Sequence, residues 1–377
     1  MSMSAWTTPY APKVLAKSKK LVSPAQLPQA IPQTMGLLQE HFKSQALYTV
    51  VQLGVPDVIG DGLMDSAGIS AALGVPVNED LLARQMRVLA TCGLFEESAG
   101  PGGEFMYALT DTGALLQTGA PQPSLACAAT HWLEPPMWNM WGSLLEATMT
   151  PEGGQPPFDR ANGANWIEYF QAHPESMAPF NDTMSFFSGG EVAGVVDDYA
   201  AGWDQFKGKT VLDVGGSYGV VMAAVKAKNP DIECISFDLP DVIATAPDGI
   251  APGVSLAGGD MFDASTYPKG VDAVFMKHIL HDWSDADCGR ILAAIAASLP
   301  SGGKVIVCDG VLGAPGDINP LTASQRNVDI LMAGIGGTER TEAQWRTLLG
   351  NAGFSIESVQ PASIGGPLCG FVTAVKA

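Results

Sequence analysis

The sequence predicts an α/β fold: a seven-stranded, mostly parallel sheet with helices on both faces, preceded by a mostly helical domain. Three observations support this. From residue 210 onward, short apolar runs alternate with helical stretches, as in parallel strands joined by helices. The first of these runs leads into a glycine-rich turn. Before residue 110, helical patterns are followed by a hairpin pattern.

The composition is that of a globular protein with two domains. The chain has 377 residues, of which 46% are hydrophobic, and this length exceeds the usual size of one core. A net charge of −19 disfavours nucleic acid as a partner. Six scattered cysteines without a C-x-x-C pair indicate reduced thiols in a cytoplasmic protein. No apolar run reaches the roughly 18 residues that span a membrane, so no membrane partner is expected.

The first residues differ from the rest because four lysines precede the first acid, Glu40. Such a bias is compatible with an organelle transit peptide, but the absence of arginine and the several prolines favour a flexible tail. We therefore expect a tail at 1–34, a helical winged-helix-like domain at 35–200 and a second domain at 201–377.

The helical domain is expected to begin at Met35 with a helix that ends at Gly54. A short helix follows, and then a third helix with Asn78 as its N-cap. Two strand patterns flank the turn SAGPGG at 98–103, which is a hairpin signal. Three helices and a hairpin form the outline of a winged helix.

A winged helix often binds DNA, so that alternative has to be weighed. The candidate recognition helix carries Glu79 and Asp80 against Arg84 and Arg87, a balanced set in an acidic protein. This balance disfavours DNA contact. We expect the domain to serve dimerisation instead.

Residues 121–200 form a second helical region rich in Trp, Met and Phe. Large apolar residues at helical spacing are usually core or interface, but some of them can also form the wall of a substrate pocket. The segment GWDQFKGK at 202–209 is expected to be a linker to the sheet. Seven strands are predicted beyond it, the last two as an antiparallel pair: 210–214, 234–238, 254–258, 271–276, 304–309, 354–360 and 369–377.

The segment TVLDVGGSYGVVMAAV, residues 210–225, predicts a strand, a glycine-rich turn and a helix. Its glycines allow close approach of a ligand, and the helix N-terminus favours negative charge. Asp238 closes the second strand, where a carboxylate can accept both hydroxyls of a ribose. Asp260 and Met261 close the third strand and suit the edge and face of an adenine. The alternative is that both acids only cap the following helices.

The succession VLDVGGSYG, FDLPDV, GDMF, KHILHDWSD, VIVCDGVL and GGTERTEAQWRTLL resembles the S-adenosylmethionine-dependent O-methyltransferases of the caffeic acid and hydroxyindole type. The resemblance covers nearly the whole chain. It implies a class I methyltransferase fold, Rossmann-like, with an N-terminal dimerisation domain, a homodimer, and S-adenosylmethionine as methyl donor.

The resemblance also implies a set of donor-binding residues. Gly215 would contact the methionine part, Asp238 the ribose, and Asp260 with Met261 the adenine. Ser217 departs from the glycine more usual in that turn, at a cost of roughly 1 kcal/mol if its φ is positive. The full set is Asp213, Gly215, Asp238, Leu239, Asp260, Met261, Lys277 and Trp283.

The segment KHILHDWSD, residues 277–285, supplies the catalytic residue that the resemblance implies. His281 matches the family's general base, and Asp309 and Glu339 match the two acids that orient it. Asp309 is one methylene shorter than the usual glutamate, so we expect a longer contact or one through water. A metal pair of His278 and His281 is disfavoured because no third nitrogen or sulfur ligand lies nearby in sequence, and no metal is expected.

The expected reaction is methyl transfer to a hydroxyl of a small, aromatic metabolite. One alternative is S-methylation of a thioether hydroxy acid to a sulfonium, with Arg326 or Arg340 binding the carboxylate. Another is a regulator that binds the donor without catalysis. Candidates for contact with the acceptor are Trp132, Trp138, Met140, Phe180, Met184, Asn327 and Leu331.

Overall fold

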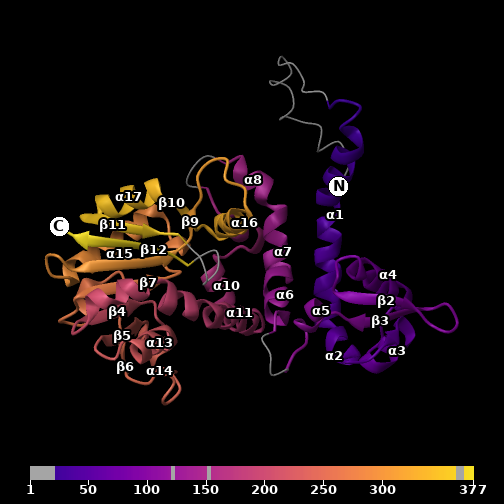
Figure 1. Ribbon diagram of the computed structural model, residues 1–377, viewed down its shortest axis with the longest axis horizontal. Helices are drawn as coiled ribbons and strands as arrows, with labels where there is room; N and C mark the ends of the chain where they lie inside the picture. The colour runs from indigo at the N-terminus through magenta and orange to yellow at the C-terminus, as the bar shows by residue number, and fades with distance from the viewer. Residues whose placement is uncertain (1–21, 120–123, 151–153, 362–368) are drawn as a thin grey trace. The chain divides into compact units, whose positions relative to one another are not determined.

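The computed structural model describes residues 22–119, 124–150, 154–361 and 369–377. The chain divides into two compact units, Met1–Ala114 and Leu115–Ala377 (Figure 1). We call them the N-terminal and the C-terminal unit and describe each by itself.

The N-terminal unit packs helices against a small antiparallel sheet of order β1-β3-β2. Its core includes Val50, Ile69, Met86 and Tyr107, all fully buried. The predicted helices and hairpin are present, and α2, β1 and α5 are added. The elements are α1 (Leu27–Gln52), α2 (Val55–Ile59), β1 (Met64–Asp65), α3 (Ser66–Leu73), α4 (Glu79–Ala90), β2 (Phe95–Ala99), β3 (Phe105–Leu109) and α5 (Asp111–Ala114).

The start of α1 corrects the predicted tail. The helix begins at Leu27, so a flexible segment through residue 34 is wrong for residues 27–34. Pro28 lies in the first turn, where a missing N–H costs no helical hydrogen bond. Pro32 lies inside the helix, so prolines are a poor guide to its start. The tail and transit-peptide predictions for residues 1–21 lie outside the described residues.

The C-terminal unit is built on a seven-stranded sheet of order β11-β12-β8-β7-β4-β5-β6. Five strands are parallel, and β12 pairs antiparallel with both β8 and β11. All seven predicted strands and the antiparallel pair are confirmed. Their bounds are β4 (Thr210–Val214), β5 (Glu233–Asp238), β6 (Val254–Gly258), β7 (Ala273–Lys277), β8 (Lys304–Asp309), β11 (Phe354–Gln360) and β12 (Gly370–Lys376).

Alternate residues of the strands pack on opposite faces, as the two-residue period of a strand requires. Leu212 and Val274 face one core with helices α15 (Asp285–Ser298) and α17 (Glu342–Asn351). Val211 and Phe275 face the other core with α13 (Val220–Lys228), the π-helix Gly194–Asp198 and α12 (Ala200–Trp203) (Figure 1). Both faces of the sheet are therefore covered, which explains the nearly continuous apolar strands.

The segment expected to link two domains is part of the second core. The side chains of Trp203 and Phe206 are at most 1% exposed. Nε1 of Trp203 donates a hydrogen bond of 2.8 Å to the carbonyl of Val195. The chain therefore divides at 114/115 and not at 200/201. Charged residues around two large aromatic anchors gave this segment its linker-like composition.

Helices between residues 124 and 193 complete the C-terminal unit. Their aromatic and methionine side chains form a core around Met140, Phe158 and Phe170, with Leu331 and Ile335 of α16 (Pro320–Ile335) packed against it. These helices are α6 (Ala126–Leu133), α7 (Pro135–Gly142), α8 (Leu144–Thr148), α9 (Pro157–Asn162), α10 (Trp166–Ala172) and α11 (Pro174–Ala193).

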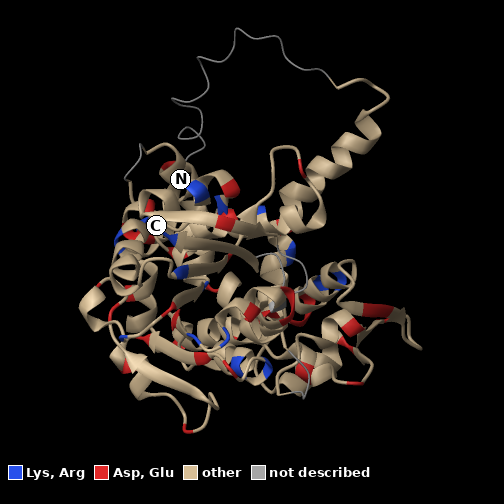
Figure 2. Cartoon of the chain, turned by 60° about the vertical axis from the view of Figure 1, so that its left-hand side comes forward, with Lys and Arg blue, Asp and Glu red and all other residues tan. Residues whose placement is uncertain are grey.

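Several surface and chemical properties bear on function. Lysine and arginine are interspersed with the more numerous acids along the chain (Figure 2). All six cysteines are free. Within the described part of the chain, no helix combines the length and the apolar character needed to cross a membrane.

Candidate active site

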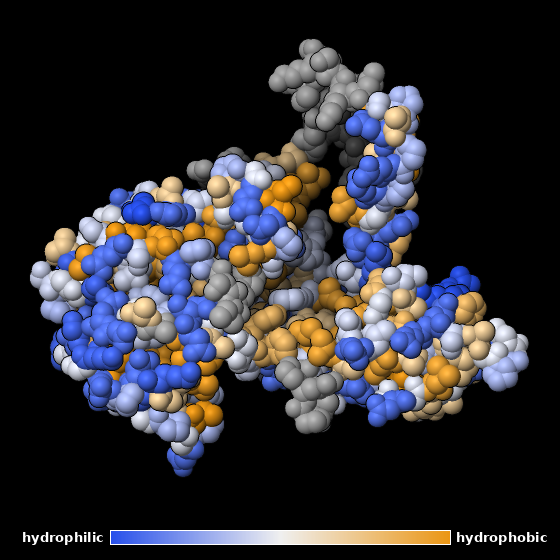
Figure 3. All heavy atoms as spheres, viewed as in Figure 1, coloured by the Kyte–Doolittle hydropathy of each residue, from blue (hydrophilic) through white to orange (hydrophobic). Residues whose placement is uncertain are grey.

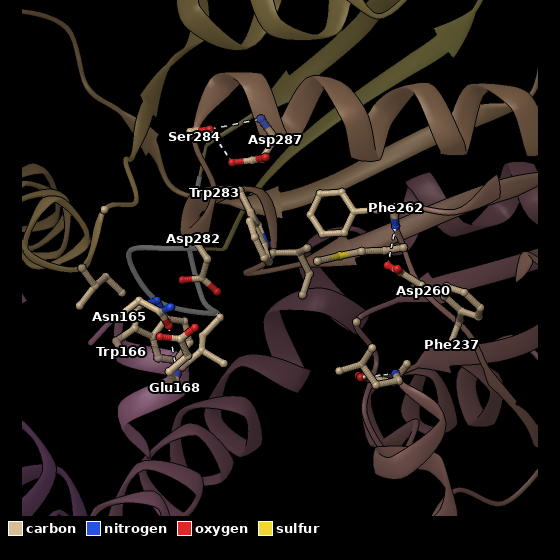
Figure 4. Close-up of a pocket in the computed structure, with 18 of the residues that line it drawn as sticks. Asn165, Trp166, Glu168, Phe237, Asp260, Phe262, Asp282, Trp283, Ser284 and Asp287 are labelled. Carbon is tan, nitrogen blue, oxygen red and sulfur yellow. Dashed lines mark hydrogen bonds between the residues drawn. The ribbon is translucent and has the colours of Figure 1, made fainter. Parts of the chain in front are cut away.

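A cavity of about 690 Å³ opens at the carboxyl ends of strands β4 to β7. In open α/β sheets this edge is where ligands bind. One wall comes from the strand ends, and another from α10 and the end of α16 (Figure 4). Six of the eight predicted donor-binding residues line it: Gly215, Asp238, Leu239, Asp260, Met261 and Trp283.

The glycine-rich turn after β4 needs its special residues. Gly215 has a φ of +74°, and a Cβ at this position would overlap the Cδ1 of Ile279. Ser217 also has a positive φ, +49°, so the cost of roughly 1 kcal/mol expected for a non-glycine residue applies. Its backbone N–H donates to Oδ2 of Asp238 over 2.8 Å, which ties the turn to the end of β5.

Asp238 and Asp260 are both held by backbone donors near their own strand ends. Oδ1 of Asp238 accepts from the N–H of Leu239 over 2.7 Å, and Oδ1 of Asp260 accepts from the N–H of Phe262 over 2.9 Å. These contacts do not support the helix-capping alternative, because α14 (Pro240–Ala244) has no side-chain cap and the 3₁₀ turn Ala264–Thr266 is capped by Asp263. The backbone contacts of Asp238 and Asp260 fix the direction of two carboxylates that line the cavity.

An apolar slot lies beside these acids. The rings of Phe262 and Trp283 meet edge to face with centroids 5.0 Å apart (Figure 4), and Met261 also lines the cavity. Such a slot can hold a flat heteroaromatic ring.

Asp213 and Lys277 do not line the cavity. Asp213 is 2% exposed, and burial raises the pKa of its carboxyl to about 8, although the charge of Lys277 opposes this. A Cβ on Gly216 would lie 2.6 Å from Oδ2 of Asp213, so Asp213 packs directly beneath the turn. The ammonium of Lys277 pairs with Oε2 of Glu191 in α11 at 2.9 Å.

His281, Asp309 and Glu339 come together as the resemblance implies. Nδ1 of His281 lies 2.7 Å from Oε1 of Glu339 and 3.9 Å from Oδ1 of Asp309. The longer distance fits the shorter side chain of Asp309, whose two oxygens have no hydrogen-bond partner among the described residues. Nε2 of His281 lies 3.6 Å from Oδ1 of Asp282, which lines the cavity. His281 itself is 6% exposed, just behind that wall.

The backbone sets this geometry. The short strands β9 (Val311–Leu312) and β10 (Arg340–Thr341) pair in parallel, with Arg340 opposite Val311. This pairing brings Glu339, which precedes β10, next to the end of β8, where Asp309 lies. The N–H of Thr338 donates to the carbonyl of His281 over 2.8 Å. A Cβ on Gly337 would overlap that same carbonyl, so only glycine permits this approach.

Arg340 holds the segment around His281 in place through residues 280–285. Its guanidinium is buried, donates to the carbonyls of Leu280 and Trp283, and pairs with Asp285 over 2.7 Å. Arg340 is therefore fully engaged and does not line the cavity. Arg326 is exposed and also lies outside the cavity wall.

The carboxylates around His281 make it a strong base. Burial lowers the pKa of the imidazole, but the charges of Asp282, Asp309 and Glu339 outweigh burial and raise this pKa to about 10. Burial raises the pKa of the Asp309 carboxyl to about 7, against the attraction of His281. The cluster thus stabilises an imidazolium, which is the state that a base reaches after taking a proton.

His278 stacks on the ring of His281, with ring centroids 5.3 Å apart. Its backbone has a φ of +55°, and Nδ1 lies 3.3 Å from the ammonium of Lys277. Glu191, His278 and Cys369 place one possible metal-ligand atom each within 4.8 Å of one another. The carboxylate of Glu191 already has a cationic partner in Lys277.

None of the seven predicted acceptor residues lines the cavity. Met140, Phe180 and Leu331 belong to the aromatic core behind it, while Trp132 stacks on Phe187. Met184 and Asn327 are exposed, and Trp138 is half-buried.

The wall is formed instead by Asn165, Trp166, Ile167 and Glu168 of α10 with its N-cap, and by the end of α16. In the sequence, Asn165 can be recognised as the N-cap of a helix, but this does not show that the helix lies at the cavity.

The whole architecture can now be compared with known proteins. Residues 141–355 match the model of the O-methyltransferase domain, and residues 35–119 match that of the O-methyltransferase dimerisation domain. The chain belongs to the O-methyltransferase family. This O-methyltransferase is an enzyme of the S-adenosylmethionine-dependent, small-molecule type, with the class I fold.

Its relatives include nicotinate N-methyltransferase 1 of Glycine max, 36% identical over 82% of this chain and 87% of that protein. Among solved structures, the mitomycin 7-O-methyltransferase MmcR has a TM-score of 0.79 at 30% identity, covering 94% of this chain and all of MmcR. NcsB1 from neocarzinostatin biosynthesis, solved with S-adenosyl-L-homocysteine and 1,4-dihydroxy-2-naphthoic acid, has a TM-score of 0.68 at 25% identity, with 89% and 96% covered.

The cavity fits the donor of this family. S-Adenosylmethionine is the methyl donor, and it supplies an electrophilic methyl group on a positively charged sulfur. The cavity offers a glycine turn that allows close approach, two fixed carboxylates and an apolar slot in one continuous space.

Proposed function

We propose that the enzyme methylates a hydroxyl of a small aromatic metabolite, with His281 as general base. The contact of 2.7 Å between Nδ1 of His281 and Glu339 carries this proposal. It holds the proton on Nδ1, which leaves Nε2, on the side of cavity-lining Asp282, to accept a proton from the acceptor. A neutral hydroxyl is a poor nucleophile, and it attacks a methyl group more readily as its proton is removed.

Asp309 and Glu339 act as positioning residues in this proposal. Glu339 selects the tautomer through its direct contact, and Asp309 adds negative charge from 3.9 Å. Both stabilise the imidazolium that forms when the proton arrives. The positive charge of the donor acts in the opposite sense and lowers the pKa of His281, so that neutral imidazole is available when both substrates are bound.

For the donor, we propose that Asp238 binds the ribose hydroxyls and that Gly215 lies against the methionine part. Asp260, Met261 and Trp283 would hold the adenine, and Leu239 would complete this wall of the cavity. Asp213 and Lys277 would support the site from below, since neither reaches the cavity surface.

An aromatic acceptor is supported by apolar residues of the helical wall. Trp166 of α10 and Ile335 of α16 line the cavity, and Phe180 packs against Trp166 with ring centroids 5.8 Å apart. Flat apolar walls of this kind suit an aromatic ring. The NcsB1 structure contains 1,4-dihydroxy-2-naphthoic acid, which is an aromatic diol and thus a compound of the proposed class.

The alternative of S-methylation gains no support from the site. A thioether hydroxy acid needs a cation for its carboxylate, and the described residues that line the cavity include no lysine, arginine or histidine. Arg340, one of the two predicted cations, is bound to Asp285.

Labelled donor and a panel of phenols, aliphatic alcohols, pyridines and thioether acids test the proposed function. We expect label in an O-methyl ether of at least one phenol, identified by mass spectrometry. Transfer only to a nitrogen, a thioether or an aliphatic alcohol would show that the acceptor class is wrong.

Replacing Asp309 with asparagine is expected to shift the pH dependence of kcat/KM. Only neutral His281 accepts a proton, so activity rises with pH as His281 loses its proton. The charge of Asp309 helps to raise the pKa of His281, so its removal lowers this pKa and moves the activity limb to lower pH. The measurement is the pH profile of both proteins, with the exposed Asp204→Asn as control. An unchanged limb would mean that Asp309 does not act on His281.

We propose that the enzyme is a homodimer that uses α1. The match to a dimerisation domain begins at residue 35, and α1 exposes large apolar side chains, with Leu38 61% and Phe42 57% accessible (Figure 3). Sedimentation equilibrium should give about twice the chain mass of 39.3 kDa. Leu38→Asp with Phe42→Asp should shift the mass toward the monomer. A monomeric parent protein would contradict the proposal.

A further inference from the structure

The cavity is lined by acids without any basic side chain. Five carboxylates line it, from Glu168, Asp238, Asp260, Asp282 and Asp287. Among the described residues of the lining, lysine, arginine and histidine are absent. The donor accounts for only part of this charge, because Asp238 and Asp260 lie at the strand ends where its nucleoside is expected.

Two of the remaining acids have partners that limit their effect on a ligand. Asp287 accepts from Ser284 and pairs with Arg290 over 3.0 Å, so its charge is partly neutralised at the surface. Asp282 lies 3.6 Å from Nε2 of His281 and belongs to the base cluster.

Glu168 differs from both. Its backbone N–H is capped by Asn165 over 3.0 Å, but its carboxylate forms no ion pair or hydrogen bond with any residue that the structure describes. Figure 4 shows Glu168 with Asn165 and Trp166 on α10, and the carboxyl of Asp282 is directed toward this group. Glu168 is exposed in the first turn of α10, where the helix N-terminus favours an acid, and it has no cationic side chain as partner among the described residues.

The charge of Glu168 also acts on its protein neighbours. Burial raises the pKa of Asp159 in α9, and the nearby Glu168 raises it further. Oδ1 of Asp159 is buried without a hydrogen-bond partner among the described residues. Glu168 lines the cavity and Asp159 lies outside the lining, so it is the charge of Glu168 that makes this wall repulsive to an anion and attractive to a cation.

We propose that the methyl acceptor is an aromatic alcohol that carries an amine, cationic near neutral pH, and that Glu168 binds this amine. The inference rests on the proposed function and narrows its acceptor class. Trp166 and Ile335 would contact the ring, while the hydroxyl would face His281. An acceptor with a carboxylate in place of the amine would meet Glu168 and Asp282 as like charges.

The test compares phenols that share one ring and one two-carbon side chain and differ in the terminal group and its charge. Tyramine is the cation, N-acetyltyramine the neutral form and 3-(4-hydroxyphenyl)propionate the anion, and the corresponding catechols form a second set. We expect kcat/KM to fall from cation to neutral form by about five- to tenfold, and further for the anion. Equal values for the three forms would overturn the proposal.

Variants assign the effect to one side chain. Glu168→Gln should bring the ratio of cation to neutral form to about one, and Glu168→Lys should reverse the preference toward the anion. Asp182→Asn, an exposed acid of α11 outside the lining, should leave the ratio as in the parent enzyme. A ratio that persists in Glu168→Gln would exclude Glu168 as the binding group.

Calorimetry separates this inference from the proposed function. The same compounds are titrated into the enzyme saturated with S-adenosylhomocysteine, which needs no turnover. If no phenol is methylated, the proposed function fails, yet tighter binding of the amines that is lost in Glu168→Gln would still support the charge preference. If phenols are methylated and bound without regard to charge, the proposed function stands and this inference fails.

Discussion

Replacing His281 with alanine should lower kcat by about 10²–10⁴-fold on a weakly acidic phenol. The reason is that the acceptor would have to lose its proton to water, without the imidazole that Glu339 holds in place. Donor affinity should stay close to that of the parent enzyme, since His281 lies behind the cavity wall. Single-turnover rates and calorimetry with S-adenosylhomocysteine measure the two quantities separately.

Acceptor acidity gives this experiment its sharpest readout. A nitrophenol is already ionised near neutral pH and needs no base, so the deficit of His281→Ala should shrink on such acceptors. His173→Ala replaces a partly exposed histidine that contacts Glu175 and lies outside the cavity lining; it is the matched control and should not change the rates. A full rate for His281→Ala on a weakly acidic phenol would disprove base catalysis by this residue.

Replacing Asp238 with asparagine should weaken donor binding by about 10- to 100-fold, because hydrogen bonds to a charged group contribute about 1.5–3 kcal/mol. The asparagine amide still has one acceptor oxygen, but it cannot accept hydrogen bonds from both ribose hydroxyls with the negative charge of a carboxylate. The dissociation constant of S-adenosylhomocysteine measures the effect.

The neighbouring exposed acid provides the control for Asp238. Asp241→Asn lies in α14 (Pro240–Ala244), outside the cavity lining, and should bind the donor as the parent enzyme does. Thermal unfolding of both variants checks that the turn held by Ser217 is intact. Equal affinity in Asp238→Asn and the parent would remove Asp238 from the donor site.

The sheet could be predicted from sequence because its central strands are buried on both faces. Runs such as TVLDV and KVIVCD are apolar throughout most of their length, and their ends meet at the same edge. The unit boundary could not be predicted in this way. Trp203 and Phe206 are anchors whose burial depends on tertiary packing, and their polar neighbours conceal this in the sequence.

The strand-end residues predicted to bind the donor do line the cavity, because a strand end fixes their position. The residues predicted to contact the acceptor do not line it. The helical wall comes from α10 and α16, which reach the cavity through helix packing, whereas the abundance of aromatic and methionine residues pointed to Met140 and Phe180 in the core. Glu168 carries no local signal of a site, since an acid in a first helical turn is ordinary.

The close approach at Gly337 has a consequence for the evolution and redesign of this enzyme. Because Gly337 has no side chain, the backbone at 337–338 can approach the carbonyl of His281 closely. The distance between the imidazole of His281 and the carboxylate of Glu339 is therefore set by the main chain. Under the proposed function, part of the acceptor wall comes from α10, which does not take part in this junction. We therefore expect substitutions in α10 to alter the range of acceptors, while the proton-transfer geometry is passed on intact.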